Sequence, residues 1–264
     1  MARSALCIGI NDYPSAVGKL AGCVNDAHDW SAMLSGRGFT VKTLLDAQAT
    51  RAALVDGLST LIGGAKKGDT VVITYSGHGT WVPDESGDET DARDEGWCPH
   101  DLTTAGALLD DEIHAIFGTR AAGVRIVLIS DSCHSGSVTR GDDSDVDAGA
   151  PKARFAPPAA WMKPSQVTLL KPVKPPVLSG GMSRTGGDLL LSGCTDVEFS
   201  WDTSFRGRPN GAFTYYALKV LAERKPATYE AWFKEVRAYL PSTSLPQNPQ
   251  IYGSRGARKF KVLD

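Results

Sequence analysis

Two short apolar runs limit the folds open to this chain more than any other feature. Val71–Tyr75 reads VVITY and Arg125–Ser130 reads RIVLIS. Unbroken runs rich in β-branched residues are typical of central strands in a parallel sheet that is buried on both faces. Similar runs predict further strands at Ala5–Ile10, Phe39–Leu45 and Leu189–Leu191. The chain is therefore expected to form a sheet whose centre lies deep in the core.

Helical patterns are expected between and after these strands. Apolar residues recur at helical spacing in Asn25–Ser35, Thr50–Ile62, Asp110–Phe117, Gly211–Ala222 and Tyr229–Leu240. Thr50 is a suitable N-cap for its helix, and Lys259–Leu263 is expected to be an edge strand at the end. Strands that alternate with helices predict an α/β domain with a mostly parallel central sheet and helices on both faces.

Composition excludes several classes of function. The chain has 264 residues, which fits one domain, and its formal charge of −2 comes without any block of Lys or Arg. Neither a nucleic-acid partner nor a membrane surface is expected, and no stretch is long enough to span a bilayer. The five cysteines are odd in number and widely spaced, so a reducing compartment and a cytoplasmic location are expected.

Reactive side chains follow both central runs. The first continues through Ser76 and Gly77 to His78 and Gly79, and the second through Asp131 and Ser132 to Cys133. If the two strands are neighbours, His78 and Cys133 meet at the carboxyl edge of the sheet, where function collects in such folds.

A thiol beside an imidazole can act as a nucleophile. The backbone N–H groups of Cys133 and of the turn around Gly79 would then be the natural donors to an oxyanion. A single Cys or His after a strand is more often structural. The two together, in the order His then Cys and about 55 residues apart, favour a catalytic dyad.

The motifs at these positions resemble a known family. Tyr75-Ser-Gly-His-Gly79 and Asp131-Ser-Cys-His-Ser-Gly136 are similar to the paired signatures of metacaspases and of their bacterial relatives, the orthocaspases. Further similar motifs are Gly9-Ile-Asn-Asp-Tyr13, Gly22-Cys-Val-Asn-Asp26, Ser192-Gly-Cys-Thr-Asp196, Gly211-Ala-Phe-Thr and Pro249-Gln-Ile-Tyr-Gly253. The resemblance covers nearly the whole chain except residues 138–187, and it weakens after Asp196.

The resemblance implies a fold and a division of the chain. We expect one caspase-like domain, a three-layer sandwich with about six strands. Residues 1–137 would correspond to the large subunit of caspases and residues 188–264 to the small one. Residues 138–187, rich in Pro, Gly, Asp and Ser, would be a linker or an inserted loop.

The resemblance also implies specificity for substrates with Arg or Lys before the cleaved bond. The matching positions are Asp26 and Asp131, with Ser76 as a further substrate-binding residue. Paired carboxylates would bind a guanidinium through charge-assisted hydrogen bonds. The residues alone favour simpler roles: Asp26 as a helix N-cap or an acid in the first turn of a helix, and Asp131 as a turn former beside the nucleophile.

A cluster of acidic residues precedes the second central strand, and the resemblance implies that it takes part in calcium binding. Eleven acidic residues lie between Asp84 and Glu112 against one basic residue, Arg93. A solvated acidic loop is the simple explanation, and a Ca²⁺ site is the alternative, since Ca²⁺ takes oxygen ligands. The resemblance implies Asp94, Asp110, Asp111 and Asp142 as ligands.

The expected function is that of a cysteine endopeptidase that acts on peptides or proteins, as a monomer, and that processes itself in the linker. The linker offers basic residues for such a cut: Arg140, Lys152, Arg154, Lys163, Lys171, Lys174 and Arg184. A plain surface loop is the alternative for the linker. For the whole chain, the alternatives are a silent caspase-homologous binding or scaffold module and a legumain-like or clostripain-like peptidase of different specificity.

Overall fold

A six-stranded sheet forms the centre of the molecule. The computed structural model describes residues 1–83, 93–133, 150–163, 188–195 and 198–264. The sheet has the order β12-β9-β7-β3-β1-β2, and its strands are Gln250–Tyr252, Leu189–Ser192, Arg125–Asp131, Thr70–Ser76, Arg3–Gly9 and Thr40–Leu45. All neighbours pair in parallel except β12, which runs antiparallel to β9. The predicted mostly parallel α/β sheet is confirmed.

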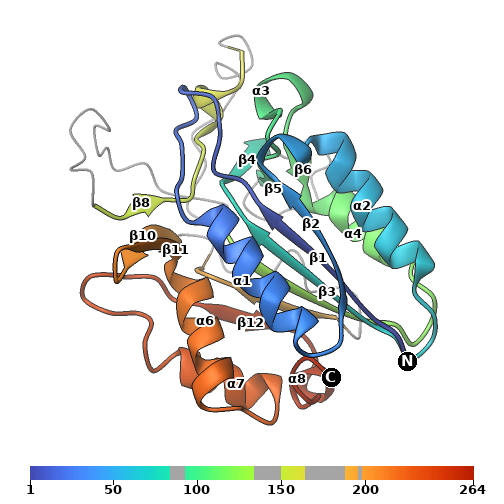
Figure 1. Ribbon diagram of the computed structural model, residues 1–264. Coiled ribbons are helices and arrows are strands. Elements are labelled where there is room, and N and C mark those ends of the chain that lie inside the picture. The colour runs from blue at the N-terminus through green and yellow to red at the C-terminus, as the bar shows by residue number, and fades with distance from the viewer. Residues whose placement is uncertain (84–92, 134–149, 164–187, 196–197) are drawn as a thin grey trace.

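Helices cover both faces of this sheet (Figure 1). The side chains of β1 alternate between two hydrophobic layers, as the two-residue period of a strand requires. Leu6 and Ile8 belong to the layer beneath α2 (Arg51–Gly64) and α4 (Asp110–Gly118). Ala5 and Cys7 belong to the opposite layer, which is covered by α1 (Cys23–Ser35), α6 (Ala212–Glu223) and α7 (Tyr229–Val236). The three-layer sandwich is therefore present.

Two small antiparallel sheets lie beside the carboxyl ends of the central strands. One has the order β4-β5-β6 and the other β11-β10-β8. Their strands, in chain order, are Gly79–Pro83, Arg93–Trp97, Leu108–Leu109, Lys152–Ala153, Trp201–Phe205 and Arg208–Gly211. The remaining short helices are η1 (Asp46–Gln48), α3 (Leu102–Ala105), η3 (Pro158–Ala160) and α8 (Arg255–Arg258). Both small sheets border the candidate site described below.

One predicted element is wrong, and one predicted cap is confirmed. The edge strand is Gln250–Tyr252, whereas the expected edge strand at Lys259–Leu263 forms only an isolated bridge at Lys261. Val262 and Leu263 are both buried in the layer with α6 and α7, so consecutive apolar residues anchor the chain end in the core instead of alternating along a strand. The Thr50 hydroxyl accepts a hydrogen bond from the N–H of Ala53, as a helix cap does.

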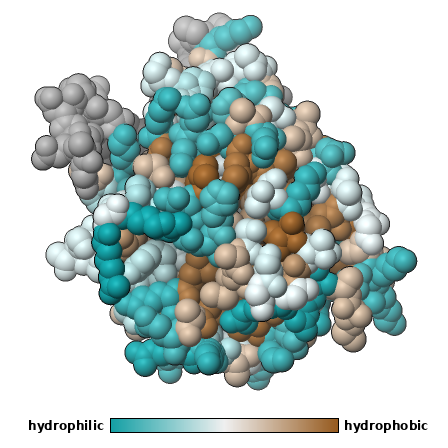
Figure 2. Space-filling model, viewed as in Figure 1, coloured by the Kyte–Doolittle hydropathy of each residue, from teal (hydrophilic) through white to brown (hydrophobic). Residues whose placement is uncertain are grey.

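The surface of the described residues is mostly polar. In the view of Figure 2, hydrophobic side chains show only as scattered spots among hydrophilic ones. Met1 and Phe260 are the exposed large hydrophobic side chains in the described part of the chain. Within those same ranges, the helices are all too short or too polar to cross a bilayer.

Candidate active site

The two strands expected to carry the reactive residues are neighbours. β3 and β7 pair in parallel, with Ser76 opposite Asp131. His78 and Cys133 each come two residues after these partners, so both lie at the same carboxyl edge. Gly79 and Cys133 donate their backbone N–H groups to one oxygen, the carbonyl of Arg154, over 3.0 and 3.1 Å. The two predicted oxyanion donors therefore converge on a single point.

The residue that supplies this carbonyl lies within the predicted linker. β8 (Lys152–Ala153) pairs with β10 just before Arg154, and the Arg154 N–H donates to the carbonyl of Ser200 over 2.9 Å. Cys133 has no exposed surface. Its backbone N–H meets the carbonyl of Arg154, and its sulfur accepts a hydrogen bond from the N–H of Ser200 over 2.6 Å. A substrate residue before a scissile bond needs the same arrangement: a carbonyl between oxyanion donors and a backbone fixed against the cleft wall.

The side chain of Arg154 fills a pocket lined by three carboxylates. Its Nη2 donates to Asp26 over 2.7 Å and to Asp202 over 2.9 Å. Its Nη1 lies 3.0 Å from the carbonyl oxygen of Asp131 and 3.4 Å from the carboxylate of the same residue. All four side chains are buried. The structure thus brings together the predicted pair, Asp26 and Asp131, and adds Asp202 as a third acid.

Backbone N–H donors also hold the three carboxylates in place. Asp26 accepts from the N–H of Gly211, Asp131 from the N–H of Thr214 over 2.8 Å, and Asp202 from the N–H groups of Ala21 and Gly22. Gly211 must be glycine, because a Cβ there would lie 2.2 Å from the Asp131 carboxylate and 2.5 Å from the Arg154 guanidinium. Such fixed donors orient the carboxylates toward one point in the pocket.

The buried carboxyl groups and the guanidinium act on one another in this pocket. Burial raises the pKa of the Asp26 carboxyl to about 7, while the charge of Arg154 acts in the opposite direction. Three carboxyl groups surround one guanidinium at low dielectric, where an unpaired ion is costly. A cation is therefore the group that this pocket is built to receive.

His78 is held as a neutral imidazole. Its Nε2 donates to the carbonyl of Gly18 over 2.9 Å, since a carbonyl can only accept. In the neutral ring Nδ1 must then carry the lone pair, and Nδ1 is buried without a hydrogen-bond partner in the described part of the chain. Burial lowers the pKa of His78 to about 4. Nδ1 is thus available as a proton acceptor at neutral pH.

Two tyrosines fix the backbone around this histidine. The Tyr13 hydroxyl accepts from the His78 N–H over 3.1 Å, and the Tyr75 hydroxyl donates to the His78 carbonyl over 2.6 Å. The Tyr13 ring also lies against the imidazole, with 4.7 Å between ring centroids. Rigid neighbours of this kind preorganise a catalytic side chain.

The lowered pKa of His78 predicts a pH-dependent loss of stability. The unfolded imidazole binds a proton near pH 6.5 and the folded one only near pH 4, so the unfolded state gains protons first as the pH falls. From pH 7.5 to 4.5, the free energy of unfolding should fall by about 2–3 kcal/mol more with His78 than with Gln in its place. Urea unfolding of two proteins measures this difference: Cys133→Ala, in which no bond is cut, and the same protein with His78→Gln added. If the free energy of unfolding depends on pH in the same way in both, the prediction is contradicted.

One predicted substrate-binding residue, Ser76, stays untested, and two residues of the site were not predicted from the sequence. Ser76 ends β3, is buried, and pairs with Asp131, so its role in substrate binding stays a prediction. Asp202 was missed from the sequence because it follows Asp196, where the resemblance weakens. Arg154 was counted only among the basic residues of the linker. The signal for Asp202 was an acid beside aromatic residues in a short strand, Trp201–Phe205.

The predicted calcium ligands are only partly brought together. Asp94 lies on β5, and Asp110 and Asp111 begin α4 directly after β6, which pairs with β5 through Gly96 and Leu109. Asp142 lies outside the described residues. In the described ranges, the His, Cys, Asp and Glu side chains form no group of three or more suited to a metal ion. These residues alone therefore do not make a complete calcium site.

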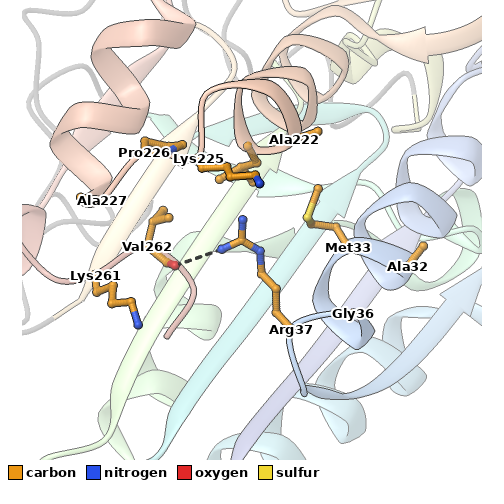
Figure 3. A pocket seen from close by; sticks show the side chains of 11 residues that line it. Ala32, Met33, Gly36, Arg37, Ala222, Lys225, Pro226, Ala227, Lys261 and Val262 are labelled. Atoms are coloured by element: carbon orange, nitrogen blue, oxygen red, sulfur yellow. Dashed lines mark hydrogen bonds between the residues drawn. The ribbon is translucent and has the colours of Figure 1, made fainter.

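A second hollow of about 580 Å³ lies at the far end of α1 (Figure 3). Arg37, Lys225 and Lys261 line it, and Arg37 donates to the carbonyl of Val262 over 3.3 Å. Gly36 on its wall is ten residues from Asp26 along α1, which places the two roughly 15 Å apart. This hollow is not part of the candidate site.

The chain is similar to proteins of one known family. Residues 3–140 match the family model described as metacaspase, peptidase C14 domain. The chain is 32% identical to Metacaspase-1 of Cryptococcus neoformans over 96% of its length and 62% of that protein, and 31% identical to Metacaspase-1 of Mycosarcoma maydis, over 96% and 70%. It thus spans less than two thirds of the Cryptococcus protein. A crystal structure of a Geobacter sulfurreducens protein matches with a TM-score of 0.74 and 31% identity, over 100% and 98% of the two chains.

Proposed function

The chain belongs to the metacaspase family, and from that premise we propose that it is a cysteine endopeptidase that cuts peptide bonds after arginine. One observation carries the proposal: the chain's own Arg154 lies in the site as a substrate residue would. Its carbonyl accepts from Gly79 and Cys133 while its guanidinium lies among Asp26, Asp131 and Asp202. The predicted roles of Cys133 as nucleophile and His78 as base fit this placement.

The proposed reaction needs only the groups of this chain and water. The Cys133 thiol gives its proton to His78 Nδ1, and the sulfur attacks the carbonyl carbon. The N–H groups of Gly79 and Cys133 stabilise the resulting oxyanion. The imidazolium protonates the leaving amine, which departs and leaves a thioester. His78 Nδ1 then takes a proton from a water molecule, whose oxygen attacks the thioester carbon. The imidazolium returns that proton to the departing thiolate, and the carboxylic acid that forms loses its own proton to the solvent.

Arginine is favoured over lysine by the shape of the pocket. Nη1 and Nη2 of Arg154 reach different acceptors at the same time, the carbonyl oxygen of Asp131 on one side and the carboxylates of Asp26 and Asp202 on the other. A lysine has a single nitrogen and cannot span this fork. We propose that lysine substrates are cut more slowly and that aspartate substrates are rejected by charge.

The same placement makes Arg154–Phe155 the bond for self-processing. Three of the seven basic residues of the predicted linker lie within the described residues: Lys152, Arg154 and Lys163. Lys152 is exposed on β8 and Lys163 is exposed at the end of its described segment, while the guanidinium of Arg154 is fully buried in the pocket. Cleavage would leave Arg154 with a new carboxyl group and Phe155 with a new amino group.

A panel of peptides that differ only before a fluorogenic amide tests this function. We expect kcat/KM for Arg to exceed that for Lys about tenfold, and that for Asp or Gln at least about a hundredfold. Asp26→Asn should lower the Arg value by about thirtyfold or more, because it leaves the ligand cation underpaired. The panel is run on the wild type and on Arg154→Gln, in which the chain's own arginine does not compete. Preference for Asp, or no hydrolysis by either chain, would refute the proposal.

Calcium binding is proposed as a separate property. Support comes from the register of β5 and β6, which brings Asp94 toward the start of α4, where Asp110 and Asp111 lie. In the described ranges these side chains do not gather into a group of three suited to a metal ion. Running the panel in calcium and in chelator, beside calorimetry of Ca²⁺ binding, tests it. Full activity in chelator without heat on Ca²⁺ addition would dispose of it.

The setting of the enzyme is also a proposal. All five cysteines are free thiols, which supports a reducing compartment such as the cytoplasm. The scattered hydrophobic spots on the surface support a monomer that acts on peptide or protein substrates, without nucleic acid or membrane as a partner.

A further inference from the structure

The segment that enters the site also shows what lies beyond the cut. Phe155 forms a parallel bridge with Gly79, and the Ala156 N–H donates to the Gly79 carbonyl over 2.9 Å. The Thr80 hydroxyl donates to the Ala156 carbonyl over 2.7 Å. Gly79 therefore serves both sides of the Arg154–Phe155 bond: its N–H holds the carbonyl before the cut, and its carbonyl holds the second residue after it.

The two residues after the cut lie in different surroundings. Ala156 has no exposed surface and belongs to the hydrophobic layer that also contains Tyr13 and Trp97. Phe155 is only half-buried, and 6.2 Å separates the centroid of its ring from that of Phe199. A larger side chain at the second position would have to displace close-packed neighbours, whereas the first position remains open on one side.

We propose that β4 forms a second specificity site, which selects a small side chain two residues after the cleaved bond. Thr80 is its positioning residue, because its hydroxyl fixes the carbonyl of that second residue. The inference rests on the proposed function, since it assumes that substrates follow the path of residues 154–156. It adds a requirement on the leaving half of the substrate.

The chain's own segment remains a competitor at this site. The Trp161 indole N–H donates to the Thr80 hydroxyl over 3.0 Å, so the segment is tied to β4 beyond Ala156. The competitor is the same for every added peptide. Ratios of kcat/KM between peptides, measured on one enzyme preparation, therefore report the site itself.

Internally quenched peptides with Arg before the bond test the selection. With Phe kept directly after the bond, the second residue is Ala, Gly, Leu or Trp; a matched set keeps Ala second and varies the first residue. We expect Leu and Trp to lower kcat/KM at least about tenfold relative to Ala, and the matched set to vary less than about threefold.

The outcomes separate this inference from the function beneath it. If no Arg peptide is cut, including the fluorogenic amides that lack residues after the bond, the proposed function fails. If the amides are cut and all quenched peptides are cut equally well, or none is cut, the second specificity site is refuted.

Variants of Thr80 test the positioning role. Thr80→Val keeps the shape and removes the hydroxyl, and Thr80→Ser keeps the hydroxyl. Thr80→Val should lower kcat/KM for the Ala quenched peptide, relative to the fluorogenic Arg amide, by about threefold to tenfold. Thr80→Ser should restore the ratio. Equal ratios for Val and Thr would overturn the role of the hydroxyl.

Discussion

Cys133→Ala is expected to stop both peptide hydrolysis and the cut at Arg154–Phe155. Without the sulfur no thioester forms, so turnover should fall by at least about a thousandfold. Cys133 keeps its backbone N–H in this variant, and the carbonyl of Arg154 keeps both donors, so the fold should persist with the chain intact. Denaturing gels after incubation, together with hydrolysis of the fluorogenic Arg amide, measure the two losses.

Cys7→Ala is the matched control for that variant. Cys7 is another buried thiol, on β1, and burial raises its pKa to about 12. A thiol so hard to ionise is no nucleophile. Its removal should therefore leave the rate of peptide hydrolysis per mole of folded protein unchanged. Undiminished cleavage by Cys133→Ala would remove the foundation of the proposed mechanism.

Arg154→Gln is expected to abolish cleavage at this bond and to leave the chain active toward added substrates. Glutamine has no charge to offer the three carboxylates, so the intramolecular cut should slow by at least about a hundredfold. The pocket is then open to a free arginine. Over several hours the variant should stay as one band on a denaturing gel while it hydrolyses the fluorogenic Arg amide.

Lys152→Gln, two residues earlier, is the control. Its side chain is exposed and only its Nζ contacts a backbone carbonyl, that of Lys19 at 3.5 Å. The cut at residue 154 should therefore continue at the rate of the wild type. Continued cleavage of Arg154→Gln at the same bond would contradict the placement of Arg154, and cleavage elsewhere would move the self-processing site.

The sequence predicted the central sheet and the reactive pair for a common reason. β3 and β7 are marked by apolar runs, and the residues that follow each run are fixed in place by the strand itself. Local pattern therefore determines that His78 and Cys133 reach one edge. Asp131 follows in the same way, because it is the last residue of β7.

The rest of the site depends on contacts between distant parts of the chain. Asp202 lies on the short strand β10, where it pairs with Gly211 of β11 and with Lys152 of β8. No local periodicity in the sequence predicts that this strand lies near α1. Arg154 enters the pocket because three carboxylates from separate elements surround one point. The prediction of an edge strand at Lys259–Leu263 was wrong for a similar reason. Val262 and Leu263 have side chains typical of a strand, but both are buried in the hydrophobic layer with α6 and α7.

The parallel pairing of β7 with β9 bears on what the chain would become if it were cut after Arg154. Leu189–Ser192 lies beside Val127–Ser130 inside the central sheet, and Phe213 and Ala217 share a hydrophobic layer with Trp30. A break after residue 154 crosses none of these contacts. The two pieces would thus persist as one interlocked body, a heterodimer made from a single gene product, with the arginine-binding acids divided between its partners.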